Sequence, residues 1–274
     1  MKNLNNIKVI FIDIDKTLTN DNKKVTQKNS LAIKKAVEKG IMVVLCSGRS
    51  FSYAGMKAKE ANASEYLITS NGAQIYDYKN SKSLYENPIS KDTFAKLFNE
   101  LRKMNIECIL NTSTTRFGTK NLKRKIDKSE SFFENINDIG NENILQIVVE
   151  ASSFELMDKL IAEIKKYEDL VVLNLSRKYL ENNRNESDYY ADINNFTVNK
   201  GEGIKKFLEM FNIKKEESLC FGDYVNDLDM FDACGFKVAM ENASEELKKK
   251  ADFITLSNNN SGVAYFINKY IINN

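Results

Sequence analysis

The chain has 274 residues, of which 42% are hydrophobic, and its 40 basic residues nearly balance its 38 acidic ones to give a formal net charge of +2. This length and composition suit one large domain or two modest ones and exclude a disordered or fibrous protein. The near-neutral charge provides no global attraction for nucleic acid or an anionic membrane, so we expect neither as a partner.

The residue types that are missing or sparse narrow the possible chemistry. The chain contains no histidine, which excludes every His-based triad, general base and metal site. Its four cysteines are widely spaced and form no Cys-x-x-Cys pair, so we expect reduced thiols, with Cys46 and Cys220 in core strands. The apolar run before Asp13 is too short for a signal peptide, and no later run reaches membrane-spanning length. We therefore expect a cytoplasmic protein.

The first predicted element is a buried strand over residues 9–12, which ends in Asp13 and Asp15. Side chains alternate along a strand, so the two carboxylates are predicted to share one direction at its carboxyl end, where open α/β sheets bind ligands. Burying two carboxylates without a partner is costly, and a divalent metal is the cation that fits them best. The alternative is an Asp-rich turn after a strand.

Alternating strands and helices follow this first strand. Thr26 is predicted to cap a helix through about residue 38, with Leu31, Ala32, Ala36 and Val37 on its inner face and Gly40 as its end. The next predicted elements are a strand over 41–46, a helix over 51–61, a strand over 66–69 and a hairpin over 73–78. This order is typical of a parallel sheet with right-handed crossovers.

The pattern changes at about residue 85, near the only proline, and the alternation returns after about residue 195. Between these points we predict helices over 92–104 and 154–167, strands over 108–111, 144–149 and 170–174, and a polar stretch up to about 142. Beyond them we predict helices over 203–211 and from 227, and strands over 218–221 and 236–240. The predicted fold is α/β, with a Rossmann-like parallel-sheet core formed by residues 1–84 and 195–274. Residues 85–194 form an inserted α+β domain.

Three further motifs follow strands or begin a helix of this core. Ser47-Gly48-Arg49 offers a hydroxyl, an unhindered amide and a cation, which suit an oxyanion, although such a turn can also be purely structural. Lys200 stands at the head of a helix, where a lysine is usually solvated. Asp223, Asn226 and Asp227 follow another strand, and alone they are equally typical of a turn with an Asp cap.

These motifs are expected to meet, because the strand ends of one parallel sheet converge on one edge. Together they resemble the haloacid dehalogenase superfamily of phosphotransferases, and specifically its Cof-type subclass IIB of small-molecule phosphatases. The resemblance covers essentially the whole chain. Its residues are Asp13-Ile14-Asp15 with Thr17-Leu18, Ser47-Gly48-Arg49, Lys200 in Asn199-Lys200-Gly201-Glu202-Gly203, Gly222-Asp223 with Asn226-Asp227, Ser70-Asn71-Gly72-Ala73, and a tail of Ser257-Asn258-Asn259 and Ser261-Gly262-Val263-Ala264.

The resemblance implies a Mg²⁺-dependent phosphatase that forms an aspartyl-phosphate on Asp13. Asp15 would protonate the leaving alcohol and later deprotonate the attacking water. The implied Mg²⁺ ligands are a carboxylate oxygen of Asp13, the carbonyl of Asp15 and Asp223, with Asp227 holding a metal-bound water. The implied phosphate-binding groups are Ser47, the amides of Ile14 and Gly48, Asn226 and Lys200. The expected substrates are small phosphorylated metabolites, first sugar phosphates and then flavin mononucleotide or pyridoxal phosphate, enclosed by the inserted domain as a cap.

Several positions remain open at this level. Arg49 and Asn71 match subclass positions on the substrate side, yet either is also suited to stabilising a loop. Lys16 replaces the glycine that is usual in the subclass, and because other branches of the superfamily carry bulky residues there, the backbone need not adopt positive φ. Its side chain is expected to point to solvent, with an adjustment of substrate choice or pH dependence as the alternative. The basic tract of Lys120, Lys123, Arg124 and Lys125 is typical of a solvated loop, with a second-anion or nucleic-acid site as the alternative, and Phe132 and Phe133 are expected in the core of the insert.

Two other functions fit the same motifs. One is a phosphomutase acting on sugar phosphates, which needs a basic cluster in the cap directed at the core. The other is a regulator that binds phosphorylated metabolites without turnover, although the two intact aspartates of the first motif argue against it. Neither the physiological substrate nor the oligomeric state is predicted.

Overall fold

The computed structural model describes residues 4, 6–120, 130–176, 180 and 189–272. The chain forms two compact units, one of Met1–Leu84 with Asn199–Asn274 and one of Tyr85–Val198. In the described part of the chain, no helix combines the length and apolar character that crossing a bilayer requires.

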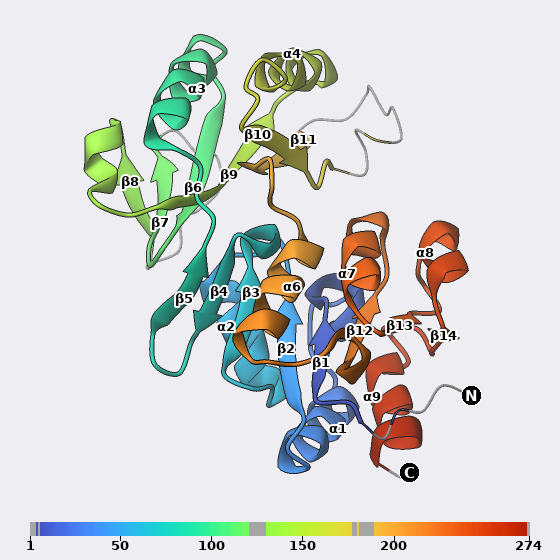
Figure 1. The fold of residues 1–274 in the computed structure, drawn as a ribbon. Helices are drawn as coiled ribbons and strands as arrows, with labels where there is room; N and C mark the ends of the chain where they lie inside the picture. The colour runs from blue at the N-terminus through green and yellow to red at the C-terminus, as the bar shows by residue number, and fades with distance from the viewer. Residues whose placement is uncertain (1–3, 5, 121–129, 177–179, 181–188, 273–274) are drawn as a thin grey trace. The chain divides into compact units, whose positions relative to one another are not determined.

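The first unit is built on a sheet of eight strands in the order β14-β13-β12-β1-β2-β3-β4-β5 (Figure 1). The strands from β14 to β3 are parallel, and β4 runs antiparallel to β3. Their bounds are β1 (Val9–Ile12), β2 (Met42–Cys46), β3 (Tyr66–Thr69), β4 (Gln74–Asp77), β5 (Lys82–Glu86), β12 (Ser218–Gly222), β13 (Phe236–Ala239) and β14 (Phe253–Ile254). The helices of this unit are α1 (Gln27–Glu38), α2 (Phe51–Ala61), α6 (Lys200–Met210), α7 (Leu228–Ala233), α8 (Glu245–Lys250) and α9 (Gly262–Ile267).

Helices cover both faces of this sheet. Phe11 and Phe221 lie on opposite faces, because Phe221 is paired with Ile12 and neighbouring residues of a strand point in opposite directions. Phe11 packs edge-on against Phe207 of α6, and Phe221 packs in the same way against Phe266 of α9. The predicted Rossmann-like arrangement follows from this packing, and it leaves the carboxyl ends of the parallel strands as the place for a ligand.

The second unit is a sheet of six strands in the order β10-β11-β9-β6-β7-β8, antiparallel except between β7 and β8. The strands are β6 (Glu107–Thr112), β7 (Arg116–Thr119), β8 (Glu130–Phe133), β9 (Ile144–Ala151), β10 (Leu170–Leu173) and β11 (Tyr189–Asn195). Helices α3 (Lys91–Lys103) and α4 (Phe154–Ile164) share one buried cluster with inward-facing strand residues such as Val149 and Ile193, so both lie on the same face.

Three strands of the second unit were not predicted from the sequence. β7 and β8 lie in the stretch that was predicted to be an irregular polar segment, and β11 was not predicted at all. Arg116 of β7 and Glu130 of β8 form an ion pair at 2.5 Å. Such polar strands lack the apolar alternation that signals a strand, and their pairing with neighbours decides their conformation. Phe133 is buried as expected, whereas Phe132 points to the opposite face of β8 and is 53% exposed.

The second boundary between the units lies between residues 198 and 199, a few residues after the expected boundary at residue 195. Asn195 is the last residue of β11, where it is paired with Leu170, and its Nδ2 donates to the carbonyl of Pro88 at 3.1 Å. Residues 195–198 therefore belong to the inserted unit. The first boundary between the two units lies between residues 84 and 85.

Helix α1 has the predicted capping residues, but two of its four predicted inner residues are not fully buried, since Val37 is partly exposed and Leu31 is exposed. The Thr26 side chain accepts a hydrogen bond from the Asn29 amide at the helix start, and Gly40 has a φ of +84° after its end. The buried residues are Asn29, Ala32, Ile33 and Ala36. Leu31 precedes this stripe by about 100° of helix rotation and is 51% exposed, contrary to expectation.

Candidate active site

Four neighbouring strands of the first unit carry the predicted motifs at one edge of the sheet. Asp13 follows β1, Ser47 follows β2, Ser70 follows β3 and Asp223 follows β12, and these four strands are adjacent and parallel. Lys200 is the first residue of α6 and is 3% exposed. Local sequence therefore places each group at a strand end or helix start, and the sheet order brings them together.

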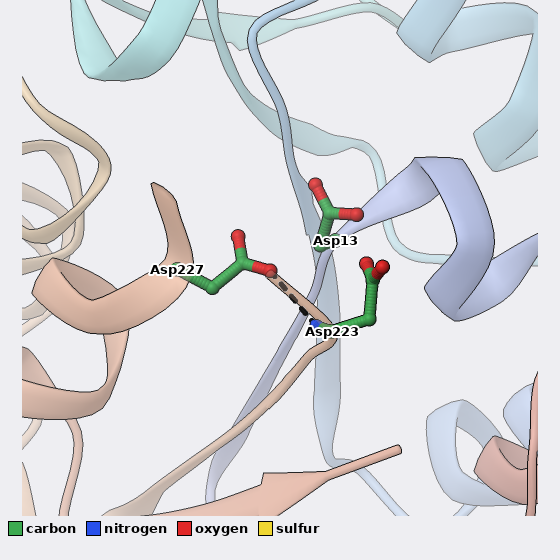
Figure 2. Close-up of side chains that lie close together, drawn as sticks. All are labelled: Asp13, Asp223 and Asp227. Atoms are coloured by element: carbon green, nitrogen blue, oxygen red, sulfur yellow. Dashed lines mark hydrogen bonds between the residues drawn. The ribbon is translucent and has the colours of Figure 1, made fainter. Parts of the chain in front are cut away.

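The centre of the site is a buried cluster of Asp13, Asp223 and Asp227 (Figure 2). One carboxylate oxygen from each lies within 4.8 Å of those from the other two. Lys200 Nζ donates to Asp13 Oδ1 at 2.6 Å and to Asp227 Oδ1 at 2.7 Å. One buried ammonium thus faces three carboxylates, so the cluster has an excess of negative charge that a bound cation would offset.

Asp227 is held by protein donors on both oxygens. Its Oδ2 accepts the amides of Asp223 at 2.9 Å and of Tyr224 at 3.2 Å, in addition to the Lys200 bond at Oδ1 (Figure 2 shows the Asp223 amide bond). Gly222 makes this approach possible, because a Cβ there would lie 2.7 Å from the Cβ of Asp227. Asp227 therefore fixes the loop that carries Asp223 and also orients Lys200.

Burial and mutual repulsion shift the titration of this cluster. Burial raises the pKa of Asp13 well above its ordinary value; Lys200 lowers it in part, and Asp227 and Asp223 raise it again. Burial, followed by the charge of Asp227, raises the pKa of Asp223 to about 7. Burial disfavours the Lys200 ammonium, but Asp13 and Asp227 outweigh it and hold the pKa of Lys200 well above its ordinary value.

The donor set fits a hard divalent cation. In the described part of the chain, Asp13 Oδ2 and Asp223 Oδ2 receive no hydrogen bond from a protein donor, whereas Asp13 Oδ1 accepts from Lys200 and Asp223 Oδ1 accepts from Thr17 at 2.9 Å. Oxygen ligands and excess negative charge suit Mg²⁺ or a similar ion rather than a thiolate- or imidazole-bound metal. Thr17, which is fully buried, was quoted in the first motif but was given no role there.

Asp15 is not part of the acidic cluster, and the strand on which its predicted direction relied ends before it. β1 ends at Ile12, and residues 14–18 form a tight turn in which the Leu18 amide donates to the Asp13 carbonyl at 3.1 Å. The strand alternation therefore does not extend to Asp15. Its carboxylate is instead bound by Arg49, with Nε to Oδ2 at 2.9 Å and Nη2 to Oδ1 at 3.1 Å.

The loops after β2 and β3 are joined to each other through their backbones. The Ser70 amide donates to the Arg49 carbonyl at 3.0 Å, and the Asn71 amide donates to the Ser47 carbonyl at 3.1 Å. Ser70 and Asn71 both adopt positive φ, and both are buried. Asn71 thus lies within this pair of loops, and Gly48 is the partly buried residue at the bend between Ser47 and Arg49.

The remaining predicted residues occupy less central positions. Ile14 is buried in the turn after Asp13, and Asn226 is exposed in the turn that leads to Asp227. Lys120 is exposed in the inserted unit, whereas Lys123, Arg124 and Lys125 lie outside the described residues. All four cysteines are buried and unbridged, as expected.

Comparison with known proteins identifies the family. The model of the haloacid dehalogenase-like hydrolases matches residues 10–267. The chain belongs to this family. Among curated proteins, the hydrolase is 29% identical over 266 residues to the 5-amino-6-(5-phospho-D-ribitylamino)uracil phosphatase of Bacillus subtilis, covering 97% of this chain and 96% of the relative.

Solved structures agree with this assignment. A haloacid dehalogenase-like hydrolase from Bacteroides thetaiotaomicron superposes with a TM-score of 0.82 at 25% identity, covering 96% of this chain and 99% of the other. A subclass IIB sugar phosphatase shares the fold with a TM-score of 0.75 at 20% identity, covering 96% and 98%. The predicted family, the α/β fold and the assignment as an enzyme of phosphatase type are confirmed.

Glycines seat the helix that carries Lys200, a role that the sequence analysis did not assign. A Cβ on Gly201 would lie 2.4 Å from the carbonyl oxygen of Asp229, and one on Gly203 would lie 2.8 Å from the Cα of Gly72. Helix α6 therefore lies against α7 and against the Ser70–Gly72 turn with no room for a side chain. The Gly-x-Gly spacing directly after Lys200 was the available signal.

Lys16 has the backbone conformation that the sequence analysis considered unnecessary. Its φ and ψ are +60° and 5°, and its carbonyl accepts from Asn242 Nδ2 at 3.0 Å. The turn between Asp15 and Thr17 therefore requires the left-handed region, which a lysine tolerates at a cost of about 1 kcal/mol. The side chain is exposed, as expected.

We expect Lys16→Gly to be more stable than Lys16→Ala by about 1 kcal/mol, because both lose the ammonium but only alanine keeps the Cβ that disfavours positive φ. Urea denaturation of the two variants and the native hydrolase measures the difference. Equal midpoints for the glycine and alanine variants would show that this turn is not strained.

Proposed function

We propose that the hydrolase is a Mg²⁺-dependent phosphatase of small phosphate monoesters, with sugar phosphates as its substrate class. The buried cluster of Asp13, Asp223, Asp227 and Lys200 at the carboxyl edge of the sheet carries the proposal. The relatives support the substrate class, since one is named for a 5-phospho-D-ribityl compound and a protein of the same fold is named a sugar phosphatase. Residues 85–198 would act as the cap that surrounds the leaving group.

In this proposal Asp13 attacks phosphorus and forms an aspartyl-phosphate, which divides a slow hydrolysis into two faster steps. Asp15 gives a proton to the leaving-group oxygen and then takes one from the attacking water, a contribution of ~10²–10⁴-fold. Lys200 offsets the charge on Asp13 and, with Ser47, Asn226 and the amides of Ile14 and Gly48, binds the phosphate oxygens.

Asp13, the carbonyl of Asp15 and Asp223 would hold the metal, with Asp227 behind them. When bound, Mg²⁺ would neutralise the repulsion between the phosphate dianion and the carboxylates. Asp227 itself keeps Lys200 charged and aligned through the 2.7 Å contact.

Phosphate release from a panel of sugar phosphates, with p-nitrophenyl phosphate as a generic ester, tests this proposal. We expect turnover with Mg²⁺, inhibition by Ca²⁺, and loss of activity in excess chelator. A protein that hydrolyses none of these esters, or that is undiminished by chelator, would contradict it. Transfer of the phosphoryl group to a second sugar hydroxyl instead of water would favour the mutase alternative.

The Mg²⁺ requirement should depend on pH through Asp223. Its pKa of about 7 means that protons compete with the metal below pH 7, so the Mg²⁺ concentration for half-maximal activity should rise as the pH falls below 7, by up to about tenfold per pH unit. Titrations with Mg²⁺ at several pH values between 5.5 and 8.5 measure this. A requirement that stays constant across pH 7 would contradict a pKa near 7 for Asp223.

Substitution of the two aspartates after β12 should separate their roles. We expect Asp223→Ala to raise the Mg²⁺ requirement strongly, because it removes a direct ligand, and Asp227→Ala to raise it more mildly, because protein donors occupy both oxygens of Asp227. Direct Mg²⁺ titration by calorimetry gives both values without relying on turnover. If Asp227→Ala weakens Mg²⁺ binding more than Asp223→Ala does, then Asp227 rather than Asp223 is the direct ligand.

A further inference from the structure

We propose that Arg49 is a positioning residue for Asp15, and that it sets the orientation of the carboxylate that exchanges a proton with the leaving group. This inference rests on the proposed function, in which Asp15 is the acid and base. The sequence interpretation placed Arg49 either on the substrate side or in the stabilisation of a loop, and did not connect it with Asp15.

The contact between the two side chains is bidentate. Arg49 Nε and Nη2 donate to the two separate oxygens of Asp15 at 2.9 and 3.1 Å. Two parallel bonds between planar groups fix the plane of the carboxylate as well as its position, which a single bond to a lysine does not do. In the described part of the chain, no other side chain donates a hydrogen bond to Asp15.

Arg49 is itself held on three sides. Its amide donates to Ser47 Oγ at 3.2 Å, its carbonyl accepts from the Ser70 amide at 3.0 Å, and its guanidinium carbon lies 5.2 Å from the centre of the Tyr53 ring. The loops after β2 and β3 and the first turn of α2 therefore determine where this guanidinium stands. Through Arg49, these segments also fix the orientation of the Asp15 carboxylate.

The exposure of the pair suits a group that must change its charge during turnover. The Arg49 and Asp15 side chains are 49% and 36% exposed, and ion pairs that are exposed to this degree are weak. The pair can therefore orient Asp15 while its carboxylate stays partly accessible. The Asp15 proton passes to the leaving-group oxygen as the phosphorus–oxygen bond breaks, the resulting carboxylate pairs with Arg49, and the attacking water returns a proton to Asp15.

The pair also makes Arg49 a poor phosphate ligand. Its charge is balanced locally by Asp15, whereas Lys200 faces an excess of carboxylates and stands beside the nucleophile. We therefore expect Arg49 to act on the leaving group through Asp15 rather than on the phosphoryl group directly.

The test varies the leaving group in Arg49→Gln. p-Nitrophenolate leaves with little need of a proton, whereas an alkoxide leaves poorly without one, so kcat should fall about 10–100-fold for glycerol phosphate and less than about threefold for p-nitrophenyl phosphate. KM should change little for either ester. Arg49→Lys should lie between, because a point charge cannot make both bonds. Lys59→Gln, which removes an exposed charge from the same helix as Tyr53, serves as the control and should behave like the native hydrolase.

A double-mutant cycle with Asp15→Asn completes the test. If Arg49 acts through Asp15, Arg49→Gln adds no further loss to Asp15→Asn on either ester. An equal loss on all esters, a rise in KM at unchanged kcat, or a full additional loss in the Asp15→Asn background would overturn the proposal. If Asp15→Asn lowers kcat equally for glycerol phosphate and p-nitrophenyl phosphate, Asp15 is not the acid. If only Arg49→Gln lowers kcat equally for both esters, the positioning role is wrong but the proposed function remains intact.

Discussion

Asp13→Asn should abolish phosphate release while leaving the fold intact. The amide has nearly the volume of the carboxylate but is a poor nucleophile, so the aspartyl-phosphate cannot form. Because burial raises the pKa of Asp13, the metal-free native cluster carries an unfavourable charge, and the variant should melt at the same Tm or slightly higher. Phosphate release and circular dichroism melting curves measure the two effects.

Asp77→Asn is the matched control for this substitution. Asp77 is a buried aspartate of the same unit, but it accepts hydrogen bonds from the amides of Lys79 and Asn80 in a turn, away from the cluster. It should retain activity even if its stability falls. More than a few per cent of native rate in Asp13→Asn, in a preparation free of deamidated protein, would rule out Asp13 as the nucleophile.

Lys200→Ala should depress the hydrolysis of every ester, by about 10²–10³-fold, because the ammonium acts on Asp13 and on the phosphoryl group that all substrates share. It should also lower the free energy of unfolding by roughly 3–5 kcal/mol in the absence of metal, since it leaves two buried carboxylates without their cation. The measurements are kcat/KM for several esters and urea denaturation with and without Mg²⁺.

Lys57→Ala separates the two consequences of Lys200→Ala. Lys57 is also a buried lysine of this unit, bound to Glu60 at 2.8 Å and to the Lys23 carbonyl at 2.7 Å. Its loss should reduce stability while the folded fraction keeps its rates and its ranking of esters. A Lys200→Ala enzyme that lost only one ester would show that Lys200 contacts a leaving group instead.

Local signals in the sequence were enough to predict several elements of the core. Apolar runs closed by turns mark β1, β2, β3 and β12, and the Thr26 cap and Gly40 mark the two ends of α1. The motif residues stand directly after these strands, so the order of strands in a parallel sheet was sufficient to predict that they meet. β7 and β8 carry no such signal, because polar strands are specified by the neighbours with which they pair. In β11 the buried alternation of Tyr189, Ala191 and Ile193 was an available signal that the sequence interpretation missed.

The individual contacts between these motifs became visible only in the folded chain. Asp13 bonds to Lys200, 187 positions away in the sequence, and Thr17 bonds to Asp223, 206 positions away; the sequence predicted that the motifs meet at one sheet edge, but not which atoms bond. The turn at residues 14–18 holds Lys16 at positive φ, because the backbone hydrogen bonds of that turn outweigh the cost of about 1 kcal/mol for one residue. The folded loops also bring Arg49 within hydrogen-bond distance of Asp15. A partly exposed carboxylate is stabilised by such a fixed cation, so the two side chains form an ion pair.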